Sequence, residues 1–193
     1  MLWSEKPAPQ RPHLLGPQAD PRLRRILSQW LENAPGESLQ RLSWVFWLLR
    51  TRQPKRVLVA GKIDQSVLLM AAAALSLSRS GRLFLNQAPE DIQALSSLTQ
   101  AGLDWVLHRP QSRDGAGSFD AAVLCASAEE LVRQARSITP RLSAGALIIG
   151  MCSPCPNEAA ELASTLVQIE PGLESLVMAP EAMPLITMIW RGH

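Results

Sequence analysis

The sequence lacks a hydrophobic run long enough to cross a membrane. Its longest uninterrupted apolar stretch, residues 67–75, has nine residues, whereas a membrane-spanning helix needs about 20. The first ten residues, MLWSEKPAPQ, also lack the charged segment followed by an apolar segment that marks a secretory signal. We therefore expect a cytoplasmic protein.

Cysteine, glycine and proline are too scarce for several protein classes. Three cysteines, an odd number, argue against a disulfide framework. The 11 glycines and 15 prolines follow no period, which excludes a collagen-like or low-complexity chain. Apolar residues make up 47% of the 193 residues and charged residues 19%, which excludes disorder over most of the chain. One domain with a substantial core remains.

Positive charge is concentrated in the first quarter of the chain. Residues 1–56 contain ten Lys or Arg against four Asp or Glu, whereas residues 57–193 contain nine against thirteen. A basic segment of this kind could bind nucleic acid. A solvated helix face explains it more simply, so nucleic acid stays a possible but unsupported partner.

The N-terminal part divides into an arm and a helical extension. Residues 1–20 contain four prolines and no hydrophobic period, so we expect an extended arm. Residues 21–53 predict two helices, 21–33 and 38–51. The first has a single apolar stripe with helical spacing, formed by Leu23, Ile26, Leu27, Trp30 and Leu31.

The second helix is apolar nearly all round at its centre. It contains Trp44, Phe46 and Trp47, which project in different directions because i, i+2 and i+3 do not share one helix face. We expect at least one ring to contact something beyond the sheet. The hypothesis is a homodimer or a different protein partner, bound through these N-terminal helices.

Residues 54–193 predict an α/β domain. Strands are expected at residues 56–60, 82–85, 105–108, 121–125, 146–149, 176–178 and 186–190, and helices at 65–78, 89–101, 127–138 and 156–168. This alternation predicts a doubly wound, mostly parallel seven-stranded sheet with helices on both faces. The last two strands have no helix between them, which predicts a C-terminal antiparallel hairpin.

Four segments of this domain resemble class I S-adenosylmethionine-dependent methyltransferases. Residues 54–61 (PKRVLVAG) resemble the first strand and glycine turn of that family, and residues 81–85 (GRLFL) the second strand. Residues 119–124 (FDAAVL) and 142–149 (LSAGALII) resemble the fourth strand and the entry to the fifth. The resemblance covers about residues 38–193. It implies a Rossmann-like methyltransferase fold, with S-adenosylmethionine as a possible cofactor.

The residues that would hold this cofactor depart from the family pattern. Val59 stands where the family has an acidic residue, and the turn 61–65 (GKIDQ) keeps only the first glycine of G-x-G-x-G. Ile63 and Gln65 replace the other two and would crowd the cofactor. Asn86 replaces the acidic residue that binds the ribose, and it can form hydrogen bonds only without the help of a charge.

The resemblance nevertheless leaves three candidate cofactor-binding residues, Gly61, Asp64 and Asn86. It identifies no catalytic residue. Asp120 begins its strand, so we expect it at the opposite edge in a structural role. His108 is expected to form local contacts rather than to act as a base.

The three cysteines support a further alternative. Cys152 and Cys155 form a C-x-x-C before a predicted helix, whose N-terminus would stabilise a thiolate. In the family's sheet order, Cys125 would lie on the strand next to theirs, so three thiolates could form a redox pair or bind a metal. A single C-x-x-C is weak evidence, and the apolar neighbours of Cys125 favour a core position.

Three hypotheses follow for the function. The leading hypothesis is a methyltransferase-fold protein with a degenerate cofactor site that acts by binding, as an assembly or regulatory partner. The first alternative is a divergent but active S-adenosylmethionine-dependent methyltransferase. The second is a thiol redox or metal-binding protein acting through Cys152 and Cys155.

Overall fold

The computed structural model describes most of residues 36–191. The described ranges are 36–62, 65–78, 81–86, 92–108, 118–151, 156–169, 172–178 and 185–191, together with Pro21 and Ser28. Pro21 and Ser28 are both helical, within the helix expected at residues 21–33. The rest of that helix and the arm expected at residues 1–20 lie outside the described residues.

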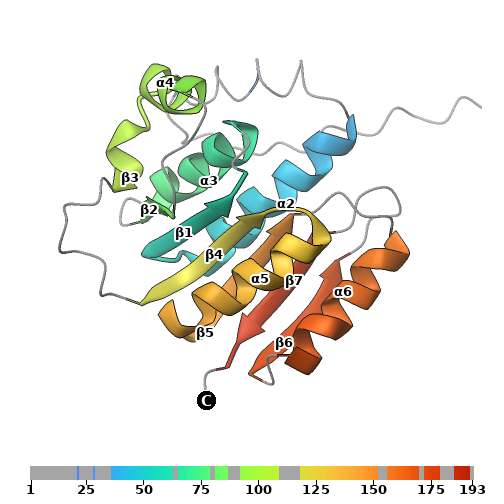
Figure 1. Cartoon of the computed structure of the whole chain (residues 1–193). Coiled ribbons are helices and arrows are strands. Elements are labelled where there is room, and N and C mark those ends of the chain that lie inside the picture. Colours follow the sequence, from blue (N-terminus) through green and yellow to red (C-terminus); the bar gives the residue numbers. More distant parts are fainter. Residues whose placement is uncertain are drawn as a thin grey trace, which may run out of the picture.

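The described strands form one seven-stranded sheet in the order β3-β2-β1-β4-β5-β7-β6 (Figure 1). The strands are β1 Arg56–Gly61, β2 Arg82–Leu85, β3 Leu107–His108, β4 Phe119–Cys125, β5 Leu142–Met151, β6 Leu173–Met178 and β7 Leu185–Trp190. The pairs among β1–β5 are parallel, whereas β7 runs antiparallel to both β5 and β6. The predicted mostly parallel sheet with a C-terminal antiparallel hairpin is confirmed.

Helices cover both faces of this sheet (Figure 1). One face carries α2 Gly36–Arg52, α3 Gln65–Ser78 and α4 Ile92–Gln100, and the other carries α5 Ala128–Ile138 and α6 Pro156–Ile169. Alternate residues of β1 therefore enter different cores: Val57 and Val59 pack towards α3, and Leu58 and Ala60 towards α5. None of the described helices is long and apolar enough to span a bilayer.

Local sequence signals explain where two of the helices begin and end. Ser127 caps α5, and its hydroxyl accepts a hydrogen bond from the Glu130 backbone N–H. At the end of α4, Gly102 has a φ of +65°. The Leu103 N–H donates to the Leu98 carbonyl and the Gly102 N–H to the Thr99 carbonyl, which together satisfy the last carbonyls of the helix.

Four strands differ from the sequence-based prediction. Two of them only begin earlier than expected, β4 at Phe119 rather than residue 121 and β6 at Leu173 rather than residue 176. The strand expected at residues 105–108 is only two residues long, because Asp104–Val106 forms a 3-10 turn. Leu107 and His108 alone pair with β2. In contrast, β5 begins at Leu142 rather than at residue 146. Its first residues pair with β4 across a register shift near Gly145, whose φ is +81°. Because of this irregularity, the first residues of β5 lack the regular alternation by which a strand is predicted from sequence.

The three aromatic side chains of α2 have three different environments. Phe46 is fully buried in the core against the sheet, and Trp44 is half-buried against the same core. Trp47 is 40% exposed, and the Arg50 guanidinium lies 5.3 Å from the centre of its ring. The partner expected through these helices stays a prediction, with Trp47 as its most exposed aromatic contact.

Asp120 joins the beginnings of three neighbouring strands. Its Oδ2 accepts hydrogen bonds from the backbone N–H groups of Lys55 (2.9 Å) and Arg56 (3.1 Å). Its Oδ1 accepts one from the Ser143 hydroxyl, at 3.4 Å. The structural role predicted for Asp120 at this edge is confirmed.

Replacing Asp120 with alanine should lower the free energy of unfolding by roughly 1–3 kcal/mol, because two backbone N–H donors lose their acceptor. Asp104 is an exposed acid in the 3-10 turn before β3, and Asp104→Ala should change stability by less than about 0.5 kcal/mol. Urea denaturation followed by circular dichroism measures both variants. Equal losses in the two variants would contradict this role of Asp120.

Candidate functional site

The strand order changes direction between β1 and β4. From β1 the chain continues to β2 and β3 on one side, and from β4 to β5 on the other. In open parallel sheets, ligands bind outside the carboxyl ends of the strands at such a point. Here Gly61 pairs with Cys125, and the Lys62 N–H donates to the Cys125 carbonyl at 2.8 Å. The candidate site lies at this edge.

Gly61 forms a turn that other residues cannot adopt without strain. Its φ is +94°, and a Cβ on this residue would lie 2.1 Å from the Cys125 carbonyl oxygen and 2.8 Å from the Gln134 Nε2. Both the backbone conformation and the lack of space therefore require glycine. The first glycine of the expected turn is present with the geometry that such a turn needs.

Asn86 lies at the end of β2, beside Gly61's strand. Its backbone N–H donates to the Val59 carbonyl at 2.9 Å, and its exposed side chain accepts a hydrogen bond from Arg141 Nη1 through Oδ1, also at 2.9 Å. This bond occupies the amide oxygen and leaves the amide nitrogen as a donor. Asn86 can therefore donate hydrogen bonds to a ligand at this edge.

The other positions of the expected motif carry no carboxylate in the described structure. Val59 is fully buried in the core on the α3 side, so a hydrophobic side chain fills the place expected for an acid. Gln65 begins α3, and its side-chain amide donates to the Ser97 hydroxyl on α4. Its side chain is therefore tied to a neighbouring helix. Ile63 and Asp64 lie outside the described residues.

The thiol site is only partly covered by the structure. Cys125 is buried at the end of β4 and belongs to the core on the α3 side, as its apolar neighbours predicted. Cys152 and Cys155 lie outside the described residues. Among the described residues, no three His, Cys, Asp or Glu side chains are grouped closely enough to hold a metal ion. The thiol hypothesis stays a prediction.

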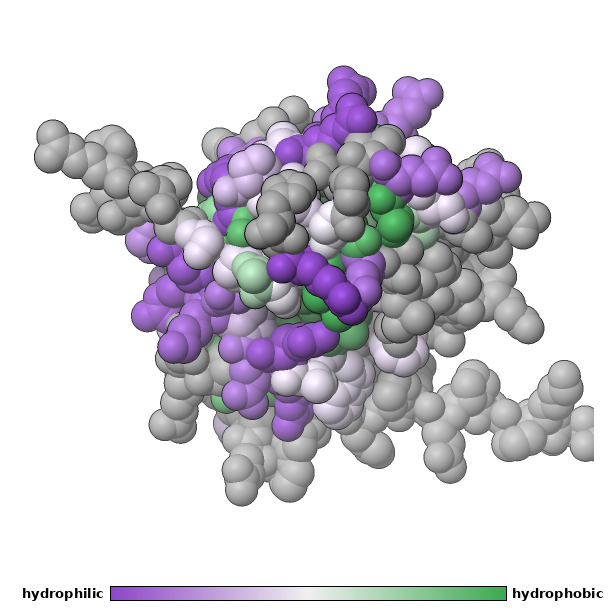
Figure 2. Space-filling model, turned by 90° about the horizontal axis from the view of Figure 1, so that it is seen from below, coloured by the Kyte–Doolittle hydropathy of each residue, from purple (hydrophilic) through white to green (hydrophobic). Residues whose placement is uncertain are grey.

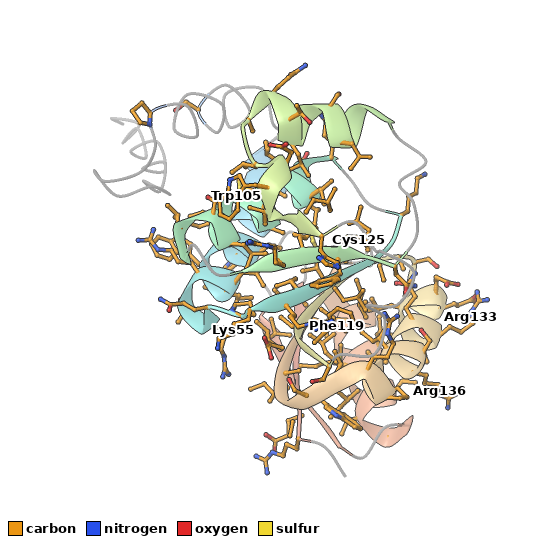
Figure 3. The ribbon with its side chains drawn as sticks, turned by 90° about the vertical axis from the view of Figure 1, so that its left-hand side faces the viewer. Lys55, Trp105, Phe119, Cys125, Arg133 and Arg136 are labelled. Carbon is orange, nitrogen blue, oxygen red and sulfur yellow. The ribbon has the colours of Figure 1, made fainter. Side chains whose placement is uncertain are left out.

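A cluster of aromatic rings and guanidinium groups was not foreseen from the sequence. The rings of Phe84 and Phe119 meet edge to face, with centres 5.2 Å apart, and the His108 ring lies 4.5 Å from that of Phe84. The Arg56 guanidinium lies over both phenylalanines, at 4.7 and 5.4 Å, and that of Arg141 over Phe119 at 5.0 Å. Figure 3 shows Phe119 at the centre of this side of the molecule.

Several solved structures of other proteins have the same fold, although no family model and no curated protein matches the sequence. The cofactor-bound protein Rv0187 from MTB superposes with a TM-score of 0.64 at 18% identity, over 91% of this chain and 92% of its own. The O-methyltransferase TomG from Streptomyces achromogenes, in complex with SAM, gives 0.61 at 17% identity over 91% and 92%.

A third similar structure is the O-methyltransferase from Bacillus cereus in complex with SAH. Its TM-score is 0.60 at 18% identity, over 89% of this chain and 91% of that protein. The described sheet order, its antiparallel hairpin and these superpositions together identify the class I methyltransferase fold. The resemblance seen in the sequence is thus confirmed at the level of the fold.

The Gly61 turn can be tested by comparison with Gly102, which also has a positive φ but would carry a Cβ with no atom within 4 Å of it. Gly102→Ala should cost about 1–2 kcal/mol of stability, from backbone strain alone. Gly61→Ala should cost more, because the added Cβ also meets the Cys125 carbonyl. Equal losses in guanidinium denaturation would show that the close approach at Gly61 does not constrain the turn.

Proposed function

We propose that this protein is an S-adenosylmethionine-dependent methyltransferase whose cofactor binds at the carboxyl ends of β1, β2 and β4. The observation that supports it most is the tight turn at Gly61, which lies at the point where the strand order changes direction. Proteins of the same fold have been solved with SAM or SAH bound. Two of these proteins are O-methyltransferases, which favours an oxygen atom as the methyl acceptor.

The residues at this edge fit the cofactor in part. The Gly61 turn keeps the backbone free of a side chain, and the Asn86 amide can donate a hydrogen bond to a ribose hydroxyl. When bound, S-adenosylmethionine supplies a methyl group on a positively charged sulfur. Because the described ends of β1 and β2 carry Val59 and Asn86 instead of acids, binding should be weaker than a charged pair of ligands would give.

The absence of these two acids also favours a second candidate function. A methyltransferase-fold protein that acts by binding another protein would not need them. The exposed ring of Trp47 on α2 is a suitable contact for such a partner. Cofactor binding and self-association separate the two candidates, and each can be measured directly.

Isothermal titration with S-adenosylmethionine and with S-adenosylhomocysteine tests the first candidate. Both should bind, and Asn86→Ala should weaken binding roughly tenfold, or about 1.4 kcal/mol, through the loss of one hydrogen bond. Gln100→Ala removes an exposed amide at the far end of α4 and should leave the affinity unchanged. A folded protein that binds neither compound at millimolar concentration would exclude the enzyme and leave the binding protein.

Light scattering over a range of protein concentrations tests the partner proposed for α2, which we take to be a second copy of this chain. A dimer should form, and Trp47→Ser should shift it towards the monomer because an apolar ring leaves the interface. Trp105→Ser is the matched control, since Trp105 is similarly exposed (44%) but lies beside β3. A wild-type protein that stays monomeric at every concentration would rule out this self-association.

A further inference from the structure

The edge of the sheet opposite the candidate cofactor site carries a concentration of positive charge. Figure 2 shows the molecule from this side, where hydrophilic residues make up most of the coloured surface and a few hydrophobic residues lie between them. We call this region the amino-edge surface. Its basic members are Arg52, Lys55, Arg56, Arg82, Arg136 and Arg141.

Strand register and helix direction place these residues at the same edge of the sheet. Arg56 and Arg82 are the first residues of β1 and β2 and pair directly. Arg141 immediately precedes β5, whose first residue pairs with the first residue of β4. The remaining three lie in or beside the segments that lead into β1 and β5: Arg52 ends α2, Lys55 precedes β1, and Arg136 is in the last turn of α5.

The described carboxylates at this edge offset only part of the charge of the six cations. Asp120 accepts hydrogen bonds from two backbone N–H groups and a hydroxyl, Asp104 is exposed beside Trp105, and Glu174 pairs with Arg191. Within the described residues, no ion pair involves any member of the amino-edge surface. Arg56 and Arg82 carry like charges at directly paired positions, which is unfavourable in a sheet. A bound polyanion would relieve this repulsion.

Aromatic rings hold three of the guanidinium groups in place. Arg56 lies over Phe84 and Arg141 over Phe119, and the Arg82 guanidinium lies 5.4 Å from the centre of the Trp105 ring. Guanidinium groups held in this way lose less conformational entropy when they bind an anion. Trp105 is itself 44% exposed, and it lies on the same side of the molecule as Lys55 (Figure 3).

We infer that the amino-edge surface binds single-stranded nucleic acid. Arginine recognises phosphate through paired hydrogen bonds, and an exposed tryptophan beside cationic groups is a platform on which an unpaired base stacks. An acidic protein would use the charges but would not need Trp105. Of the members of this surface, Arg141 reaches the candidate cofactor site through its hydrogen bond to Asn86. Arg56 and Arg82 begin their strands, at the opposite end from Gly61, and Trp105 lies beside Arg82, so the inference does not depend on the proposed methyl transfer.

The experiment measures fluorescence anisotropy of a labelled oligouridylate of about twelve nucleotides, with the full chain and no cofactor present. Binding should weaken as salt rises, and Lys55→Gln and Arg82→Gln should each reduce the slope of log affinity against log salt by about 0.7. Trp105→Ala should weaken binding about tenfold through the loss of one stacked base. Trp105→Phe should retain most of the affinity.

A control variant matches the charge substitutions. Arg133 lies one helical turn from Arg136, with a side chain 73% exposed (Figure 3), but it already forms an ion pair with Glu130, so Arg133→Gln should leave the salt slope unchanged. Circular dichroism confirms that each variant is folded.

Three outcomes would overturn the inference. The first is that the oligonucleotide does not bind even at low salt. The second is that Trp105→Ala binds as well as the wild type. This would mean that no base stacks on Trp105 and that the surface attracts polyanions in general. The third is that polyglutamate binds as tightly as the oligonucleotide and is equally sensitive to Lys55→Gln and Arg82→Gln, which would indicate an acidic protein partner instead.

Discussion

The pairing of β1 with β4 is the contact on which the rest of the structure depends. At the amino end, the Asp120 carboxylate holds the N–H groups that lead into β1. At the carboxyl end, the Lys62 N–H reaches the Cys125 carbonyl, an approach that only glycine at position 61 permits. The residues between these two ends are buried from both faces. Because the chain leaves these strands in opposite directions, their pairing also creates the edge at which a ligand can bind.

Elements bounded by polar residues could be predicted closely from the sequence. The expected bounds of α3 and β2 agree with the structure, since each is an apolar segment between polar residues. The 3-10 turn before β3 could not be predicted in this way, because Trp105 and Val106 have the residue types of a strand while the hydrogen bond from Val106 to Leu103 curls the backbone. The order of the strands came from the resemblance, since periodicity within a segment carries no information about its partner.

The candidate site, too, could be predicted only in part from the sequence. The turn at Gly61 was predictable from one glycine after an apolar strand. The bond from Arg141 to Asn86 joins residues 55 positions apart, and that from Gln65 to Ser97 joins residues 32 apart. No local pattern indicates such contacts. For the aromatic residues of α2, the spacing indicated that the rings diverge, but packing against α3 decides that Phe46 is buried and Trp47 exposed.

Arg141 links the electrostatics of the two edges of the sheet. It belongs to the amino-edge surface, yet its guanidinium extends across Phe119 to the Asn86 side chain at the end of β2. Asn86 stands where the resemblance predicts an acidic ribose ligand. It is therefore uncharged at that position and has the positively charged Arg141 as its neighbour. S-adenosylmethionine carries one more positive charge than S-adenosylhomocysteine. If the cofactor binds where we propose, this arrangement should favour S-adenosylhomocysteine relative to a site with a carboxylate. Because Asn86 is uncharged, only the guanidinium in its hydrogen bond with Arg141 carries a charge. Such a bond is weaker than an ion pair, so Arg141 can more easily exchange Asn86 for a phosphate.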